Sequence, residues 1–342
     1  MAKIRQPLQA IALSSSSTDR GRRNFLRLSA VSLTALVNAN LVACQADTPL
    51  RVALQPWCGY QFLFLAQREG LLESESIELV PTTLARDSME LLQQGRVQAA
   101  ALTLDEILRL RDIGVPVSLV MIFDISAGAD VLLAKPDIKR LADLKGRRIG
   151  LENSGLAKIL LAKLIERAQL NPGDLNIEII DFDHVNAWRN NSLDAILTYE
   201  PHLSQLQKLG LRPIFDSRHA PQLIVDALAV RTDLIQSYRV ALRHLLKAHF
   251  SVLHLWRTNP IDTSYRLSAL LGVEPDRVHV IFKGLDLPDA LYNLEYLTPP
   301  AEQLTKTVQT IGSILLHQGL IERPVDSEGL FVPDFLPGET VR

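Results

Sequence analysis

The sequence predicts an α/β protein of two lobes, each built on a mainly parallel sheet flanked by helices. The first observation is that short apolar runs alternate with helical segments from residue 51 onward, a pattern that demands a mainly parallel sheet covered by helices. The second is that this alternation begins again after Lys135-Pro136. The third is that the chain beyond residue 230 is almost entirely helical. A chain of 342 residues is long enough for two cores of ordinary domain size.

The first unit contains short apolar strands, most of which are followed by a helix. Thr103 starts one helix with Glu106 as its capping-box partner, and Gly114 ends that helix. The expected strands are 51–54, 77–80, 97–102, 117–123 and 131–134, and the other expected helices are 59–72 and 87–94.

The second unit repeats this pattern. Its expected strands are 148–151, 177–180 and 195–197, and its expected helices are 154–168, 184–190 and 201–209. A return strand at 223–230 leads into helices at 235–256 and 301–317. No further strand-rich unit follows to bury these helices, so we expect them to pack on the first lobe.

These elements predict a discontinuous lobe one, residues 45–134 plus 228–342, and an inserted lobe two, residues 135–227. The chain would cross between the lobes near Ala134 and again near Ala227. Two crossings permit hinge closure while restricting twist.

Residues 1–44 have the features of an export signal. Arg22 and Arg23, followed by Phe25-Leu26, resemble a twin-arginine signal, which implies Tat export after folding. The apolar run at 28–42 is short and interrupted by polar residues, whereas a membrane span needs about 20 apolar residues.

The signal ends in Leu41-Val42-Ala43-Cys44, which resembles a bacterial lipobox. This resemblance implies a lipoprotein in which Cys44 carries acyl chains such as palmitate and becomes the first mature residue, anchored to a membrane in the periplasm. Gln45 fits sorting to the outer membrane. The alternative is an ordinary tail with a chance cysteine.

Composition excludes some classes of partner. The chain has 36 basic and 38 acidic residues and a net charge of −2, so no global field would hold nucleic acid. The two cysteines, Cys44 and Cys58, predict no disulfide framework. No phosphate-binding loop, dinucleotide fingerprint or zinc-ligand spacing occurs, and we therefore expect no cofactor, no metal and a monomer.

Several segments carry a family resemblance in the correct order between residues 50 and 320. They are Pro56-Trp57-Cys58-Gly59-Tyr60, Asp87-Ser88, Ser126-Ala127-Gly128-Ala129-Asp130, Leu144-Lys145-Gly146, Leu193-Asp194-Ala195 and Tyr199-Glu200-Pro201. Together they resemble the NMT1/THI5-like family of periplasmic binding proteins for nitrate, sulfonates, taurine and thiamine-precursor pyrimidines. The resemblance implies a type II periplasmic-binding-protein fold with the ligand cleft between its lobes. It also implies a substrate-binding subunit that delivers a small polar solute to an ABC permease and ATPase.

Candidate binding residues follow strand ends or open helices. Ligands of open α/β sheets bind beyond the carboxyl ends of the strands, where the first amides of the helices are free. Gly59 and Gly155 would allow close backbone approach, and Trp57 or Tyr60 would cover a flat ligand face. The positions are Trp57, Gly59, Tyr60, Ser88, Thr103, Asn153, Ser154 and Gly155. Helix capping by the hydroxyl residues and core packing by the aromatic residues are the alternatives.

Acidic residues also lie near strand ends or crossings. They are Asp124, Asp130, Glu200 and Asp226, and surface solvation is their alternative explanation. The nearest basic candidates, Arg86 and Lys158, are fewer. The balance slightly favours a ligand with an amine or a cationic heterocycle over an anion, which needs donors.

The two alternative functions are an enzyme and a ligand sensor. An enzyme is disfavoured because the chain has no nucleophile elbow, and Cys58 has no neighbouring cation to lower its pKa. The cysteine-rich motif of the thiamine-pyrimidine synthases that share this fold is absent as well. A ligand sensor that docks on a membrane receptor would use the same binding residues, so the sequence leaves that alternative open.

Overall fold

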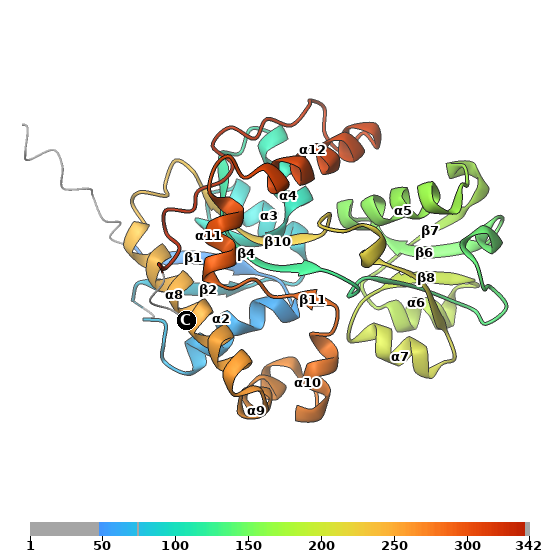
Figure 1. Cartoon of the computed structure of the whole chain (residues 1–342), viewed down its shortest axis with the longest axis horizontal. Helices are drawn as coiled ribbons and strands as arrows, with labels where there is room; N and C mark the ends of the chain where they lie inside the picture. The colour runs from blue at the N-terminus through green and yellow to red at the C-terminus, as the bar shows by residue number, and fades with distance from the viewer. Residues whose placement is uncertain (1–47, 74, 339–342) are drawn as a thin grey trace, which may run out of the picture. The chain divides into compact units, whose positions relative to one another are not determined.

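The computed structural model describes residues 48–73 and 75–338. Within this part of the chain, two mixed sheets form the cores of two lobes (Figure 1). The predictions for Arg22, Arg23 and Cys44 lie outside the described residues. No helix of the described part is both long and apolar enough to cross a bilayer.

The first lobe contains a six-stranded sheet in the order β11-β4-β10-β3-β1-β2. Its strands are β1 (Leu50–Leu54), β2 (Ile77–Pro81), β3 (Ala99–Thr103), β4 (Val117–Ser126), β10 (Val225–Arg231) and β11 (Leu285–Asp286). The pairings of β1 with β2 and β3 are parallel, whereas β10 is antiparallel to both β3 and β4. The first four strands therefore point the same way, with their carboxyl ends at one edge of the sheet.

The second lobe contains a five-stranded sheet in the order β7-β6-β8-β5-β9. Its strands are β5 (Val131–Ala134), β6 (Arg148–Glu152), β7 (Asn176–Ile180), β8 (Ala195–Thr198) and β9 (Arg212–Asp216). β6 is parallel to β7 and β8, and β5 runs against its neighbours. Strand β9 was missed by the sequence analysis because its first two residues, Arg212 and Pro213, are exposed and interrupt the apolar pattern.

The chain changes lobes slightly earlier than predicted at both crossings. β5 pairs with β8 and β9, so the first crossing lies between Ser126 and Val131 and not after Ala134. The return lies between Asp216 and Val225, before the predicted Ala227. The chain leaves β4 at the cleft edge and enters β5 from that edge, which is why β5 runs against the other strands of its sheet.

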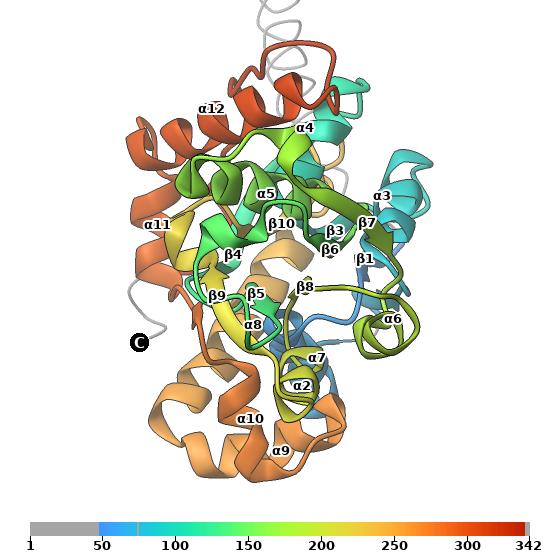
Figure 2. The same cartoon turned by 90° about the vertical axis from the view of Figure 1, so that its right-hand side faces the viewer.

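Helices cover both faces of the first sheet (Figures 1 and 2). One face packs against α3 (Ala85–Gln93), α4 (Leu104–Asp112), α11 (Ala290–Leu297) and α12 (Glu302–His317). The other packs against α2 (Gln61–Arg68), α8 (Arg239–Thr258), α9 (Pro260–Leu271) and α10 (Pro275–Ile281). The helices after β10 therefore return to the first lobe, as predicted.

The second sheet lies between α5 (Gly155–Ala168) on one face and α6 (His184–Asn190) with α7 (His202–Lys208) on the other (Figure 1). Short 3-10 helices complete the fold at Cys58–Tyr60, Leu141–Leu144, Pro172–Asp174 and Ser217–His219. Helix α5 also packs against α4 and α12 of the first lobe, so one apolar core extends from lobe to lobe.

Local sequence signals explain where the helices next to the cleft begin. The backbone amide of Thr103 donates to Glu106 Oε2 at 2.9 Å, which confirms the predicted capping box of α4. Ser154 caps α5, since its Oγ accepts from the Ala157 amide at 3.1 Å. Ser88 does not open α3, which begins at Ala85; its side chain is buried one turn inside that helix.

Candidate functional site

A cavity of about 140 Å³ lies where the carboxyl ends of the strands in the two lobes face each other. The first lobe contributes Gln55, Pro56, Trp57, Thr83, Leu84, Ala85, Thr103, Glu106, Ile224 and Asp226. The second lobe and the first crossing contribute Asp130, Glu152, Ser154, Leu156, Ala157, Phe182, His184, Leu197 and Tyr199. The loops that follow β1, β2, β3, β6, β7 and β8 thus meet at one place, as the strand-end rule requires.

Five of the predicted binding residues line this cavity: Trp57, Thr103, Asp130, Ser154 and Asp226. Gly59, Tyr60 and Asp124 do not line it, but lie behind its wall in contact with residues that do. Ser88, Asn153, Gly155 and Glu200 are not among the lining residues either.

The residues outside the lining have other roles. Ser88 Oγ hydrogen-bonds to Thr82 Oγ1 at 2.7 Å and to Gln55 Oε1 at 3.3 Å. Glu200 caps α7, because its Oε1 accepts from Ser204 Oγ at 2.6 Å and its Oε2 from the Ser204 amide at 3.2 Å. Asn153 is exposed on the loop before α5.

Trp57 is held in place by Asp124. Its Nε1 donates to Asp124 Oδ2 at 3.1 Å. A Cβ added at Gly59 would lie 1.9 Å from that same oxygen. Gly59 is therefore explained by the close approach of the Asp124 carboxylate, a packing role that needs no ligand.

Tyr60 also lies behind the cavity wall, where it holds the side chain of Asp226. Its hydroxyl donates a short hydrogen bond to Asp226 Oδ1, and its ring packs against Phe123 with a centroid separation of 4.9 Å. Burial and the charges of Asp226 and Asp124 raise the pKa of Tyr60, so the phenol keeps its proton and remains the donor. Asp226 in turn presents its carboxylate to the cavity.

Four carboxyl groups form the cavity floor or, in the case of Asp124, lie directly behind it, and all four are almost completely buried. The exposed fraction is 0% for Asp124, 2% for Asp130, 4% for Asp226 and 8% for Glu106. Burial raises the pKa of Asp124 to about 8, that of Glu106 to about 8 and that of Asp130 to about 6. Burial and the neighbouring Asp124 raise the pKa of Asp226 as well.

Two oxygens of this group have no hydrogen-bond partner within the described residues, namely Asp124 Oδ1 and Asp130 Oδ2. A buried carboxylate without a partner is costly. Asp130, which lines the cavity, therefore has an unused acceptor that a cation or a donor group can satisfy, whereas Asp124 lies behind the wall.

The second lobe contributes a hydrogen-bond network that the sequence analysis missed. Glu152 Oε1 accepts from Tyr199 at 2.8 Å and lies 2.7 Å from His184 Nε2, while His184 Nδ1 lies 2.9 Å from Thr198 Oγ1. Burial opposes ionisation of Glu152, but the hydrogen bonds from His184 and Tyr199 outweigh it and lower its pKa. Glu152 and Thr198 end strands, Tyr199 directly follows one and His184 opens a helix, and these positions were the available signal.

Aromatic and polar contacts join the lobes around the cavity. Trp57 of the first lobe meets Tyr199 of the second edge to face, with ring centroids 5.7 Å apart. Arg277 donates to Ser204 Oγ at 3.1 Å. The structure is therefore that of a closed cleft.

Lys and Arg are absent from the described residues that line the cavity, and His184 is the one histidine among them. Arg86 pairs with Asp87 at 3.6 Å and is largely exposed, and Lys158 lies outside the lining one turn into α5. Both positions considered as anion partners therefore lie away from the described walls.

Cys58 is no accessible nucleophile. Its side chain is buried and its Sγ approaches the carbonyl oxygen of Ile281 at 3.9 Å, on the side away from the cavity. Burial, with the charges of Asp124 and Asp226, raises its pKa. The thiolate that cysteine chemistry needs is thus disfavoured.

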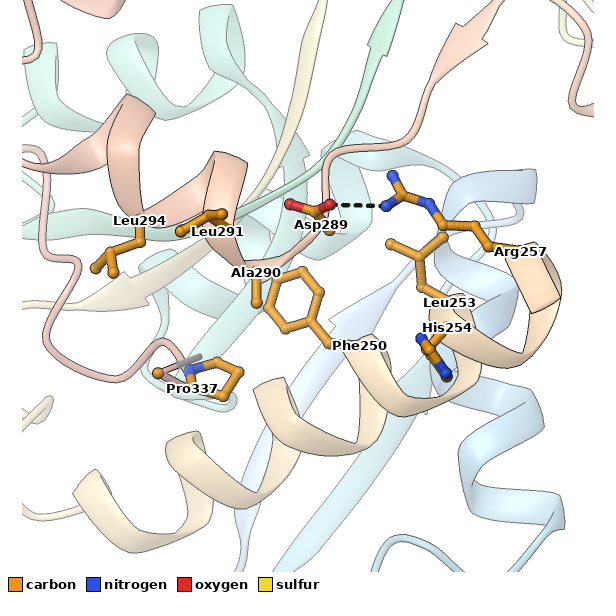
Figure 3. Close-up of a pocket in the computed structure, with 10 residues that line it drawn as sticks. Phe250, Leu253, His254, Arg257, Asp289, Ala290, Leu291, Leu294 and Pro337 are labelled. Atoms are coloured by element: carbon orange, nitrogen blue, oxygen red, sulfur yellow. Dashed lines mark hydrogen bonds and ion pairs between the residues drawn. The ribbon is translucent and has the colours of Figure 1, made fainter. Parts of the chain in front are cut away.

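A larger cavity of about 290 Å³ lies between α8 and α11 of the first lobe (Figure 3). Apolar side chains such as Phe250 and Leu291 dominate its wall, and Arg257 Nη1 pairs with Asp289 Oδ2 at 2.8 Å. The charges there satisfy each other and no strand end opens into it. We therefore place the candidate site in the cleft between the lobes.

A protein-family model described as NMT1/THI5 like matches residues 59–259. This match covers more than half of the chain, and the protein belongs to the NMT1/THI5-like family. The family resemblance in the sequence is thereby confirmed. No curated protein matches the sequence.

Solved structures share the fold at low sequence identity. The aliphatic sulphonate binding protein SsuA from Escherichia coli has a TM-score of 0.69 and 18% identity over 86% of this chain and 95% of that chain. SsuA from Xanthomonas axonopodis pv. citri, solved with MOPS bound, has a TM-score of 0.64 and 17% identity over 82% and 97%. The fold is the type II periplasmic-binding-protein fold, as predicted.

The same fold also carries an enzyme. The desulfurization enzyme DszB, solved as a mutant with biphenyl-2-sulfinic acid, has a TM-score of 0.60 and 18% identity over 84% of this chain and 97% of that chain. Fold alone therefore does not decide between binding and catalysis. The side chains that line the cleft must therefore distinguish a binding function from a catalytic one.

Proposed function

We propose that this protein is the substrate-binding component of an ABC importer and captures a small nitrogen-containing cation, an amine or a pyrimidine-like ring, by closing its lobes. The main support for this proposal is the acidic character of the cavity wall. Glu106, Asp130, Glu152 and Asp226 line it, and no Lys or Arg of the described residues does.

Electrostatics supports a cationic ligand over an anionic one. Carboxylates taken out of water lose hydration, and a bound cation restores the charge balance. A sulfonate or nitrate would instead meet the charge of Glu152 with no Lys or Arg among the described lining residues. The unpaired oxygen of Asp130, a residue that lines the cavity, adds to this preference.

Size and shape support a solute of about one ring. A dry cavity of about 150 Å³ holds a benzene molecule, and the cleft measures about 140 Å³. Trp57, Phe182 and Tyr199 are among its walls. Aromatic faces of this kind attract a cation with about 0.5–2 kcal/mol.

The mechanism follows from the position of these groups on both lobes. Trp57 and Asp226 of the first lobe bind the solute first, and Glu152 of the second lobe reaches it only on closure. A shift from 1:99 to 99:1 in favour of the closed form needs about 5.5 kcal/mol of differential binding. Two or three charge-assisted hydrogen bonds of about 1.5–3 kcal/mol each are sufficient.

The test is a thermal-shift screen of the purified protein against amines, aminopyrimidines, amino acids, nitrate and sulfonates. A ligand at 100 times its Kd stabilises the folded state by about 2.7 kcal/mol. Stabilisation by amines or aminopyrimidines is the expected result. A response confined to nitrate or sulfonates would contradict the proposed ligand class, and failure of a gene deletion to impair uptake of the hit would contradict the import role.

Export and anchoring form a separate part of the proposal. The resemblances at Arg22, Arg23 and Cys44 support Tat export and a lipid anchor that holds the binding protein beside its membrane partner. Cys44→Ser should release the protein from the membrane fraction and abolish palmitate labelling. Arg22→Lys with Arg23→Lys should leave it in the cytoplasm, and unchanged fractionation of either variant would refute the corresponding assignment.

A further inference from the structure

The amino-terminal ends of α4 and α5 meet beside the cleft, and a carboxylate of one helix lies against the first residue of the other. Asp105 is the second residue of α4 in the first lobe, and Gly155 is the first residue of α5 in the second. A Cβ added at Gly155 would lie 2.0 Å from Asp105 Oδ2 and 2.9 Å from its Cγ. The absence of a side chain at Gly155 is what lets this carboxylate approach.

Asp105 is only partly satisfied within its own lobe. Its side chain is 3% exposed, and its Oδ1 accepts from Thr103 Oγ1 at 2.7 Å. Its Oδ2, the oxygen that faces Gly155, has no hydrogen-bond partner among the described residues. Burial raises the pKa of Asp105, while the Thr103 hydroxyl and Arg109 lower it.

The amino-terminal end of α5 attracts negative charge. This helix has 14 residues, and the dipoles of its peptide units leave roughly half a positive charge at its start. Ser154 Oγ occupies the Ala157 amide. The amides of Gly155 and Leu156 make no hydrogen bond within the described part of the chain.

The junction of the two helices borders the cavity. Ser154, Leu156 and Ala157 from the start of α5 line it, together with Thr103 and Glu106 from the start of α4. An anionic group of a solute in this cavity would seek the free amides of α5, because helix amino termini bind anions. Asp105 Oδ2 lies beside the first residue of α5, next to these amides, and accepts from neither of them.

We propose that Asp105 is a specificity-determining residue: its carboxyl group lies beside the first residue of α5, next to the amides that the anionic group of a solute would seek, and so disfavours sulfonates, phosphates and carboxylates in the cleft. The exclusion is steric as well as electrostatic, since Oδ2 and Cγ of Asp105 lie against Gly155 whether or not the group is ionised. This inference rests on the proposed function and adds to it the means by which anions are rejected.

The experiment compares binding of two probes, methanesulfonate and an amine found by the screen, to three forms of the purified protein. Wild type should bind the amine tightly and methanesulfonate only weakly. Asp105→Ala should bind methanesulfonate at least about tenfold more tightly than wild type. Asp105→Asn, which keeps the shape and loses the charge, should gain less.

The matched control is Asp276→Ala. Asp276 is also the second residue of its helix, α10, but it is exposed and far from the lining of the cavity. Its removal should leave methanesulfonate binding unchanged, and an equal gain in this control would overturn the inference.

The outcomes separate this inference from the proposed function. If wild type binds methanesulfonate as well as it binds any amine, both fail. If wild type binds the amine and neither Asp105 variant gains sulfonate binding while folded by circular dichroism, only the role of Asp105 fails.

A stability measurement checks the contact itself and does not depend on any ligand. Gly155→Ala should lower the urea midpoint in wild type because its Cβ meets Asp105, and it should lower it less in the Asp105→Ala background. Strictly additive effects of the two substitutions would show that the residues do not touch and would overturn the inference.

Discussion

At the residue scale, the chemistry of the cleft depends on carboxylates in different environments. Glu152 is held by His184 and Tyr199, and these hydrogen bonds lower its pKa against the effect of burial. Asp124 and Glu106 are buried with fewer donors, and their pKa values rise to about 8. Near neutral pH, Glu152 thus provides a full negative charge for a cationic ligand, whereas Asp124 and Glu106 are mostly protonated until a cation arrives.

Glu152→Gln should weaken binding of a cationic ligand by roughly 10- to 100-fold. The variant keeps the shape of the side chain but removes the ionised acceptor, and a hydrogen bond to a charged group contributes about 1.5–3 kcal/mol. Titration calorimetry with the amine from the screen measures the change. Glu302→Gln, an exposed position at the start of α12, is the control, and equal affinities of the two variants would remove Glu152 from the site.

At the scale of the element, β4 and β10 hold the cavity floor. Asp124 and Asp226 are cross-strand partners in this antiparallel pair, so two carboxylates face the same region because of strand register. The loop after β1 covers them: Trp57 donates to Asp124 and Tyr60 donates to Asp226. Two strands and one loop therefore act together as the floor.

The raised pKa values of the buried carboxyl groups predict how the free energy of unfolding varies with pH. The pKa of Asp124 is about 8 in the folded protein and about 4 in an unfolded chain. Between these values Asp124 binds more protons in the folded state than in the unfolded state, so its contribution to stability is complete below about pH 4 and is lost as the pH rises towards 8. Each such group contributes a slope of at most about 1.4 kcal/mol per pH unit.

Asp124→Asn should make this decline shallower, since it removes one titrating group while keeping an acceptor for Trp57. Urea unfolding between pH 5 and pH 8 measures the slope. Asp334→Asn, an exposed aspartate, should leave it unchanged. A wild-type stability that rises over this pH range would mean that these carboxyls are ionised in the folded state.

A second element, α11, is fixed to the sheet by one buried side chain. Asn293 Oδ1 accepts from the Ile122 amide at 2.6 Å, and its Nδ2 donates to the Ile122 carbonyl oxygen at 3.1 Å. The side chain thereby replaces a neighbouring strand at this position of β4.

Asn293→Ala should destabilise the protein by about 1–3 kcal/mol for each of the two backbone groups left unpaired. Chemical unfolding measures this loss. Asn190→Ala, at an exposed helix position, should change stability by less than about 0.5 kcal/mol. A similar small effect at Asn293 would mean that water replaces the side chain.

At the scale of the molecule, described here for residues 48–73 and 75–338, closure depends on contacts at the crossings. Gly284 has a φ of +87°, and a Cβ added there would lie 2.5 Å from the backbone carbon of Gly128 in the first crossing. The Ala127 amide donates to the Gly284 carbonyl oxygen at 2.7 Å. The first lobe thus supports the crossing directly through backbone that tolerates no side chain.

In Gly284→Ala, the added Cβ should displace the backbone of the first crossing from residue 284. The two lobes should then favour a more open arrangement, which weakens ligand affinity without any change in the cavity wall. Small-angle scattering and calorimetry measure the two effects. Gly272→Ala has comparable backbone strain, with a φ of +65° but open space around it, and should retain wild-type affinity. Identical behaviour of the two variants would exclude a role for the Gly284 contact in closure.

The sequence by itself determined the α/β class, the order of most strands and helices, and the strand ends that face the cleft. These features depend on local periodicity and on caps such as Thr103 with Glu106, which neighbouring residues specify. The tertiary structure alone decided which strand-end residues reach the cavity. Trp57 and Asp226 line it, whereas Gly59 and Tyr60 support it from behind, because their positions depend on contacts with residues far away in the chain. The same reason explains why β5 joined the second sheet and why the approach of Asp105 to Gly155 could not be predicted: each is a pairing between distant segments, and local pattern contains no information about it.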